Sequence, residues 1–403
     1  MDDSVLKNEK TIFSIQALRG IAALLVVFAH AEQYVGAFLS VHMKKYIGPS
    51  FGAFGVDIFF VISGFIMAYI NRDNFGKKNA VWPFLARRFT RIYPIYWLVT
   101  LFVLLVIFPS GIFAYALPES EHAVIHMTTN VDYLVKCFLL LPYYDASGQI
   151  ASPVVGVAWT LIYEMFFYVI FSAMLFLDKK IYFRVLTCIF LALIAGRLVL
   201  VYANSHFNMH YFIFPYVMTY GSDLILEFIF GSYLASRYLS GKMLSNKVAL
   251  FVIVLSCISF FMLYHIPQRH WWELRGIAIF SLFYHIKSIG VGIPAAFLIY
   301  GLLSLESNEF IKISSFFIWL GDASYSIYLT HFSIALVILL SLLKKINSYS
   351  ILPGDVMVFM VWVLCVGVGC LVYRYVELPL TRAIKQWSYT KPISIVSPIV
   401  SEK

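Results

Sequence analysis

The chain has 403 residues, of which 61% are hydrophobic, 18% aromatic and only 13% charged. A water-soluble core cannot hide that much apolar side chain, so a soluble globular protein is excluded and a lipid bilayer is the expected partner. The net charge of +9 does not indicate nucleic-acid binding, because the basic residues lie in short segments between apolar stretches and form no continuous face.

The apolar stretches have the roughly 17 to 25 residues that a helix needs to cross about 30 Å of hydrocarbon. The segment 271–285 is apolar but short and flanked by charges, so it is either an eleventh span or a partly inserted helix. The sequence therefore predicts an all-α integral membrane protein with about ten transmembrane helices (ten or eleven) in one bundle. They are expected near residues 12–35, 54–70, 93–108, 155–176, 184–202, 213–236, 248–266, 288–304, 320–343 and 356–373.

The segment 71–91 is rich in arginine and lysine, and the positive-inside rule assigns it, together with the N-terminus, to the cytoplasm. The acidic, proline-containing segment 109–153 then lies outside and is a candidate lid or acceptor-binding loop. Ten spans return the basic tail 381–403 to the cytoplasm, whereas eleven would leave it outside. We expect one membrane domain, residues 1–403, with a core of about 12–380.

Two ionisable residues lie on one face of the first expected helix. Arg19 and His30 are eleven residues apart, which is about three helical turns and roughly 16 Å along the axis. One interpretation is an arginine that snorkels to lipid headgroups and a histidine in a structural hydrogen bond. The other is a functional site, because ionisable groups inside a membrane usually face a bundle interior or a water-filled cavity.

Other polar residues favour the functional interpretation. Asp57 lies near the outer end of the second helix, at a depth similar to that of His30, and Glu164 lies in the fourth helix. A histidine with a nearby carboxylate is typical of general-base catalysis, since its ordinary pKa of about 6.5 lets it exchange a proton near neutrality. We therefore predict a polar chamber, to which the ninth helix contributes one polar side: Asp322, Tyr325, Tyr328 and His331.

The basic cluster Arg87, Arg88 and Arg91 precedes the third expected helix. It is either a topological anchor in contact with lipid phosphate or a clamp for the phosphates of a ligand, since guanidinium groups match phosphate oxygens. An anionic carrier held by Arg88, Arg91 and Arg19 would point its reactive end toward His30, and coenzyme A has that shape. The cysteines show no metal-ligand spacing, so no metal is expected.

These residues closely resemble the acyltransferase-3 family of bacterial membrane acyltransferases. The resemblance covers roughly residues 12–380 and is carried by the blocks 18–30, 55–65, 87–94 with 159–164, and 324–331, with Glu377-Leu-Pro379 after the last helix. It implies transfer of an acyl group, commonly acetyl, from cytoplasmic acyl-coenzyme A to a hydroxyl of an envelope or exported glycan on the outer side. It also implies a multi-pass protein of the bacterial inner membrane.

By the same resemblance, His30 is the family's essential histidine and Glu164 matches its acidic position after the tryptophan. Asp57, expected at a depth similar to that of His30, is the third predicted catalytic residue. The important arginines are matched by Arg19, Arg88 and Arg91, and the predicted acetyl-coenzyme A site also includes Tyr328 and His331 from the last block. Family members often have a second acidic residue where this chain has Met165, so a role that needs two adjacent carboxylates is not expected.

The resulting hypothesis is that His30, oriented by Asp57 or Glu164, deprotonates a sugar hydroxyl that attacks the thioester, or else carries the acyl group transiently. The alternative is a transporter or flippase of a glycan or acyl carrier, because intramembrane charges also mark substrate pathways. Against the alternative, the sequence lacks paired interrupted helices in two similar halves.

Overall fold

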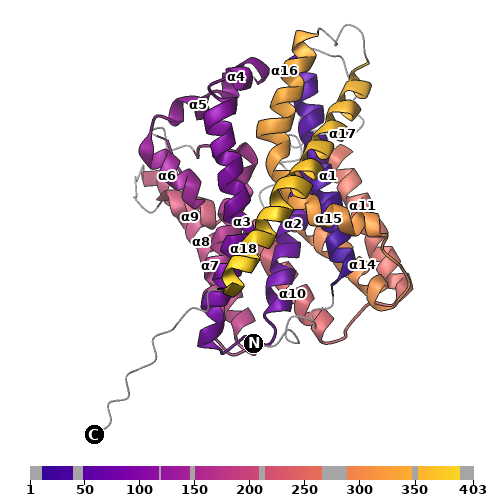
Figure 1. Ribbon diagram of the computed structural model, residues 1–403. Coiled ribbons are helices and arrows are strands. Elements are labelled where there is room, and N and C mark those ends of the chain that lie inside the picture. The colour runs from indigo at the N-terminus through magenta and orange to yellow at the C-terminus, as the bar shows by residue number, and fades with distance from the viewer. Residues whose placement is uncertain are drawn as a thin grey trace.

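The computed structural model describes residues 11–39, 49–117, 119–145, 150–207, 214–265, 288–346 and 353–390. Within these ranges every regular element is a helix, and β-type pairing is limited to an isolated bridge between Tyr144 and Ile150. The helices stand side by side in one bundle (Figure 1). The predicted all-α class is confirmed, as expected for a backbone whose polar groups must pair internally within lipid.

Two ends of the bundle are named below. The N-terminal end, at the bottom of Figure 1, is where α1 begins and α18 ends, and the α4–α5 end lies opposite. The described α-helices are α1 (Phe13–Leu39), α2 (Pro49–Ile70), α3 (Val81–Phe102), α4 (Ile112–Ala116), α5 (Ala123–Met127), α6 (Val131–Leu139), α7 (Trp159–Met174), α8 (Tyr182–Phe207), α9 (Phe214–Tyr220), α10 (Ile225–Leu239), α11 (Asn246–His265), α14 (Ile293–Ser307), α15 (Ser315–Thr330), α16 (Val337–Lys345), α17 (Gly354–Val372) and α18 (Leu378–Thr390). Shorter 3₁₀ or π turns are η1 (Lys78–Ala80), η2 (Val103–Ile107), η3 (Glu119–Glu121), η4 (Gly156–Ala158), η6 (Ser288–Gly292), η7 (His331–Leu336) and η9 (Tyr373–Glu377).

Among the described residues, seven helical stretches are long and apolar enough to cross a membrane: Phe13–Val35, Lys78–Ile107, Gly156–Met174, Tyr182–Ala203, Ser288–Ser307, Ser315–Lys345 and Gly354–Ile384. The predicted spans 54–70 and 248–266 correspond to shorter apolar stretches of α2 and α11. The predicted span 213–236 is divided into α9 and α10. The ambiguous segment 271–285 lies outside the described residues, so the predicted count of ten is not confirmed.

Helix α3 begins at Val81, well before the predicted residue 93. The loop predicted for residues 71–91 is therefore wrong over its second half, and Arg87, Arg88 and Arg91 lie on the helix. A hydropathy window rejects this stretch because of its charges, yet helix is the natural conformation for a backbone that lies among other helices. At the other terminus, α17, η9 and α18 run on continuously to Thr390, so the predicted tail 381–403 begins as helix.

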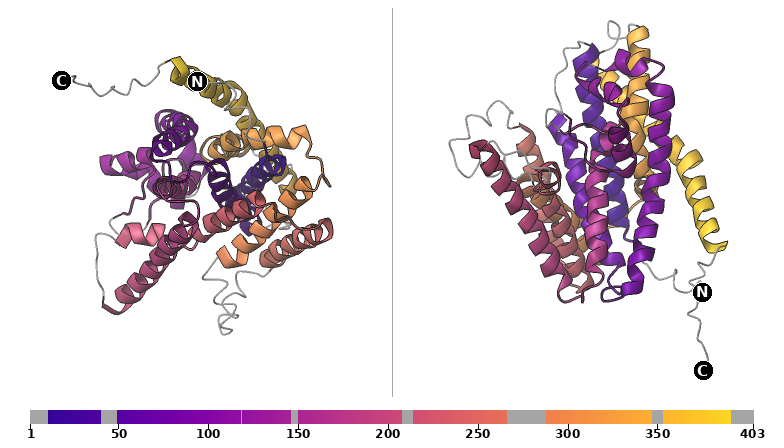
Figure 2. Two further views of the ribbon diagram at one scale, coloured as in Figure 1. Left: turned by 90° about the horizontal axis from the view of Figure 1, so that it is seen from below. Right: turned by 90° about the vertical axis from the view of Figure 1, so that its left-hand side faces the viewer.

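Helix α1 lies in the middle of the bundle, where it packs against α2, α15 and α17 (Figure 2). Two interfaces depend on glycine. A Cβ atom on Gly321 of α15 would lie 1.9 Å from the Gln16 carbonyl oxygen of α1, and one on Gly231 of α10 would lie 1.9 Å from the Val61 oxygen of α2. Small residues at such contacts let membrane helices approach backbone to backbone. The close contact with α15 brings the polar side of that helix against the Arg19 and His30 face of α1.

Candidate active site

His30 contacts a backbone carbonyl and a second histidine. Its Nδ1 atom lies 2.9 Å from the Val26 carbonyl oxygen and 3.3 Å from Nε2 of His331, the first residue of η7. Nδ1 of His331 lies 2.6 Å from the Tyr328 carbonyl oxygen. Residues 301 positions apart in the sequence thus form one histidine pair, His30 and His331.

The two carbonyls fix the tautomers of this pair. Because a carbonyl oxygen only accepts hydrogen bonds, Nδ1 carries the proton in His331, and Nε2 of that neutral ring has a lone pair. Nδ1 of His30 then donates its own proton, shared between Val26 and His331. Nε2 of neutral His30 is left unprotonated, and no described residue forms a hydrogen bond with it. A nitrogen in this state can accept a proton or attack a carbonyl carbon.

Aromatic rings enclose the histidine pair on the side of the α4–α5 end. The ring centroid of Phe332 lies 5.4 Å from that of His30, and Tyr34 stacks nearly parallel to His30 at 6.3 Å and 14°. Both His331 and Phe332 belong to the π-helical turn η7, which interrupts the otherwise α-helical stretch from α15 to α16. Single π turns inside α-helices occur frequently at functional sites.

A cavity of about 860 Å³, including its open mouth, lies between α1, α2, α3, α7 and α15. We call it the arginine cavity. Its polar lining includes Arg19, Arg88, Arg91, Glu164, Tyr168 and Tyr325. The four predicted residues Arg19, Arg88, Arg91 and Glu164, from three different helices, are therefore brought together.

The guanidinium groups of this cavity contact no acidic side chain in the part of the chain that the structure describes. Within the described ranges, none of Arg19, Arg88 and Arg91 forms an ion pair. The guanidinium of Arg88 lies over the rings of Phe84 and Tyr168, at 5.6 and 5.5 Å, and its buried Nε atom has no hydrogen-bond partner among the described residues. The described lining holds three arginines and one carboxylate, Glu164, and this excess of positive charge favours an anionic ligand.

Arg19 is held in place by a short chain of side chains. Its guanidinium donates to Gln16 Oε1 at 2.9 Å, and Gln16 Nε2 donates to Asp322 Oδ1 at 2.9 Å. The Gln16 amide therefore bridges the Arg19 guanidinium and the Asp322 carboxylate, which do not contact each other directly. Gln16 is not among the site residues predicted from the sequence, although its i,i+3 spacing from Arg19 indicates that the two side chains can interact.

Tyr328 and Thr160 close the arginine cavity toward the histidine pair. Both line it, and their hydroxyl oxygens are 2.9 Å apart, while the Tyr328 hydroxyl also donates to the Val157 carbonyl at 3.1 Å. The Tyr328 ring lies 5.9 Å from that of His331. The cavity therefore ends one side-chain layer from the histidines. Of the two last-block residues predicted to bind the donor, Tyr328 lines the cavity, whereas His331 lies behind it against His30.

Neither predicted carboxylate orients His30. Glu164 accepts a hydrogen bond from Tyr168, four residues further along α7, and lies with the arginines. Asp57 is fully buried on α2 but makes no hydrogen bond with His30. The pairing predicted from similar depth is therefore wrong, because depth along the bundle does not tell which way each helix is rotated. The orienting groups are Val26 and His331.

Comparison with known proteins shows the family of this chain. A family model described as an acyltransferase domain matches residues 12–374. The exopolysaccharide production protein ExoZ of Rhizobium meliloti is 33% identical over 303 residues, covering 73% of this chain and 81% of that protein. The acyltransferase MdmB of Streptomyces mycarofaciens is 31% identical over 175 residues, 42% of this chain and 40% of that one.

No solved structure matches the chain. The family model spans the residues that build both the histidine pair and the arginine cavity. Together with the apolar helices, this match shows a multi-pass membrane enzyme. The chain belongs to the acyltransferase-3 family and is an acyltransferase.

Proposed function

We propose that this enzyme transfers an acyl group, acetyl in the first instance, from cytoplasmic acyl-coenzyme A to a hydroxyl of an envelope or exported glycan. The relative named for exopolysaccharide production supports a glycan acceptor. The observation that carries the proposal is the arginine cavity. Its guanidinium groups form no ion pair with any described residue, and its closed end lies next to the histidine pair. The arginines that would bind a phosphorylated donor thus lie along the cavity that ends beside the histidine pair, whose His30 nitrogen would take part in acyl transfer.

The donor is expected to enter at the N-terminal end. The exposed Arg91 and the half-buried Arg88 would bind its phosphates, with Arg19 contributing further in. The buried Nε of Arg88, which has no partner among the described residues, is one donor such a phosphate would satisfy. From Arg19 to His30 the rise along α1 is about 16 Å, which is of the same order as the phosphopantetheine arm.

The reaction uses the lone pair on His30 Nε2. In one route this nitrogen takes the proton of the acceptor hydroxyl while its oxygen bonds to the thioester carbonyl carbon; the C–S bond then breaks, and the thiolate receives that proton. In the other, Nε2 itself bonds to the carbonyl carbon and the C–S bond breaks to release the thiolate; the acceptor oxygen then bonds to that carbon, the C–N bond to His30 breaks, and the hydroxyl proton passes to the thiolate. In both, the charge that forms on His30 is stabilised by hydrogen bonds from Nδ1 to Val26 and His331.

The carboxylates keep proposed roles that do not require contact with His30. Glu164, which lies among the arginines, would lower the net positive charge of the arginine cavity and reduce the repulsion between the guanidinium groups. Asp57, a buried acidic side chain of α2, keeps its proposed contribution to catalysis. The proposed location is the bacterial inner membrane, with the N-terminus in the cytoplasm; the basic residues of segment 71–91 support this orientation.

A label on the acyl group tests the proposal against the transporter alternative. We expect purified protein in liposomes, given acetyl-labelled acetyl-coenzyme A and the host's exported glycan, to place label on the glycan and release an equal amount of coenzyme A. If the label stays on the thioester while unmodified glycan crosses the membrane, the acyltransfer proposal is wrong and the protein moves glycan instead.

A further inference from the structure

A second cavity, of about 710 Å³, lies on the other side of the histidine pair, toward the α4–α5 end. We call it the outer cavity. It lies between α4, η3 and α5 on one side and the segment 150–156 on the other, and Phe332 forms part of its lining. No residue is shared between this lining and that of the arginine cavity.

Phe332 separates the outer cavity from His30. The Phe332 and His30 ring centroids are 5.4 Å apart, and the same phenyl ring lies against Gly156, where an added Cβ would come within 2.9 Å of it. Four residues after Gly156, Thr160 of α7 contacts Tyr328 of α15, and these two side chains close the arginine cavity. The two cavities therefore approach the histidine pair from opposite sides, each stopped by one layer of side chain.

A hydrogen bond joins the lining of the outer cavity to α1, the helix that carries His30. The Tyr34 hydroxyl, one turn beyond His30 on α1, donates to Glu121 Oε1 at 2.7 Å, and Glu121 lines the cavity. Tyr34 also packs on Phe332, with ring centroids 5.2 Å apart. A ligand that bonds Glu121 is therefore linked through Tyr34 to the surroundings of His30.

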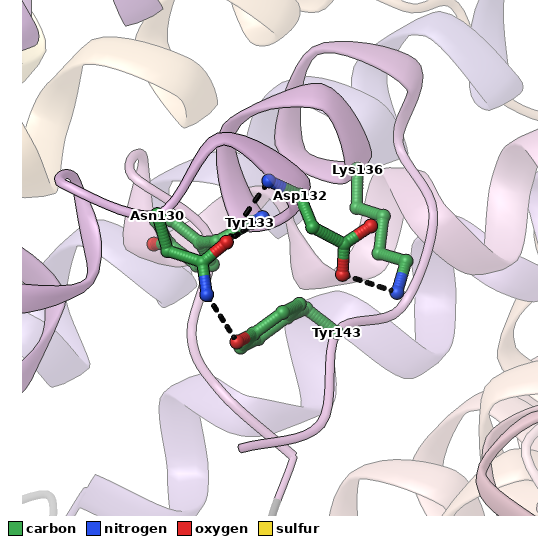
Figure 3. A network of polar contacts seen from close by, with 5 residues as sticks. All are labelled: Asn130, Asp132, Tyr133, Lys136 and Tyr143. Carbon is green, nitrogen blue, oxygen red and sulfur yellow. Dashed lines mark hydrogen bonds and ion pairs between the residues drawn. The ribbon is translucent and has the colours of Figure 1, made fainter. Parts of the chain in front are cut away.

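The opposite wall is held by the short helix α6 (Figure 3). Asn130 caps α6 and donates to the Tyr143 hydroxyl at 3.1 Å, and Lys136 pairs with Asp132 at 2.8 Å (Figure 3). From this unit, Tyr133 donates to the Ser152 carbonyl at 2.8 Å, and the Tyr143 carbonyl accepts from the Ala151 amide at 3.0 Å. Since Ala151 and Ser152 line the outer cavity, these hydrogen bonds hold this part of its wall in place.

The charge of the outer cavity is opposite to that of the arginine cavity. Among the described residues, its lining contains the two carboxylates Glu121 and Asp145 and no basic residue. Ionised carboxylates only accept hydrogen bonds, and bonds from hydroxyl groups to them are short and strong. An anionic group brought beside them would be repelled in a partly desolvated site. The lining therefore suits a molecule rich in hydroxyl groups and without negative charge.

We propose that the outer cavity binds an uncharged sugar unit of the acceptor glycan, with Glu121 and Asp145 accepting hydrogen bonds from its hydroxyl groups. The unit that receives the acyl group is then a neutral one, even in a polymer that carries acidic units elsewhere. The acylated hydroxyl reaches His30 when the Phe332 side chain turns aside, and the closed ring otherwise keeps water from the thioester. This inference rests on the acyltransfer function proposed above.

The test combines charge-neutral variants with a map of the product. We expect Glu121→Gln combined with Asp145→Asn to raise the acceptor KM about tenfold or more, since each change weakens a charge-assisted hydrogen bond. Filling the cavity with Ala151→Phe should do the same. Binding of acetyl-coenzyme A, measured by titration, should be unchanged in all of them. The matched control Glu119→Gln, on the same turn but outside the cavity, should behave as wild type.

Mass spectrometry of the host's exported glycan, fractionated into neutral and acidic oligosaccharides after labelling, should find acetyl groups on uncharged units. Acetyl on an acidic unit, or cavity variants with a wild-type acceptor KM, would overturn the inference while leaving acyltransfer intact. Wild-type protein that binds acetyl-coenzyme A but labels no glycan in any fraction would instead contradict the proposed function on which the inference rests.

Discussion

Replacing His30 with alanine is expected to lower the rate of acyl transfer about 10²–10⁴-fold, the usual contribution of a positioned general base. The expectation follows from the fixed tautomers, which leave Nε2 of His30 unprotonated, and from its position between the two cavities. The measurement is the initial rate of coenzyme A release together with label appearing on the glycan.

A histidine in the α5 helix provides the control for this change. His126 is exposed and lines neither cavity, so His126→Ala should retain wild-type activity. Both variants should show the wild-type unfolding temperature in detergent. A folded His30→Ala protein with full activity would refute the assignment. Omitting the acceptor separates the two routes, since only the covalent one leaves labelled acyl on His30 of the wild-type protein.

Replacing Arg88 with alanine is expected to raise the KM for acetyl-coenzyme A about 10- to 100-fold and to leave the acceptor KM unchanged. A hydrogen bond to a charged group contributes roughly 1.5–3 kcal/mol, and each 1.4 kcal/mol corresponds to tenfold in affinity. Arg88 lies between Phe84 and Tyr168, and these rings keep its guanidinium directed into the arginine cavity. Initial rates at varied donor and acceptor concentrations measure both constants.

Arg87 supplies a matched control for this variant. It precedes Arg88 on α3 and is exposed, but it does not line the cavity. Arg87→Ala removes the same charge from the same end of the protein and should leave the donor KM within about twofold of wild type, because exposed charges act only weakly at a distance. Equal effects of the two variants would indicate a general electrostatic attraction in place of a specific phosphate contact.

Patterns within a single helix were read correctly from the sequence. The common face of Arg19 and His30 and the polar side from Asp322 to His331 meet, as the bundle packs α1 against α15. These patterns depend only on helical geometry and on the tendency of charged groups to avoid lipid. The start of α3 was misplaced for a related reason, because its charged first turns escape a search for apolar segments.

Contacts between helices were much harder to predict. The sequence suggested a carboxylate as partner of His30, whereas the partner is His331, which the π-helical turn η7 brings to α1. Residue spacing gives no signal for that turn, nor for how α2 is rotated about its own axis. The outer cavity was also missed as a site, since its lining joins residues of several short helices and a loop with no common motif.

The most direct test asks from which side of the membrane each substrate reaches the histidine pair. Liposomes with protein of known orientation, established by protease access to a tag at the N-terminus, would receive acetyl-labelled acetyl-coenzyme A on one side and glycan on the other. We predict labelled glycan only when the donor faces the N-terminal end and the acceptor faces the α4–α5 end. Equal labelling with both substrates on one side would contradict the account of two cavities that meet at His30.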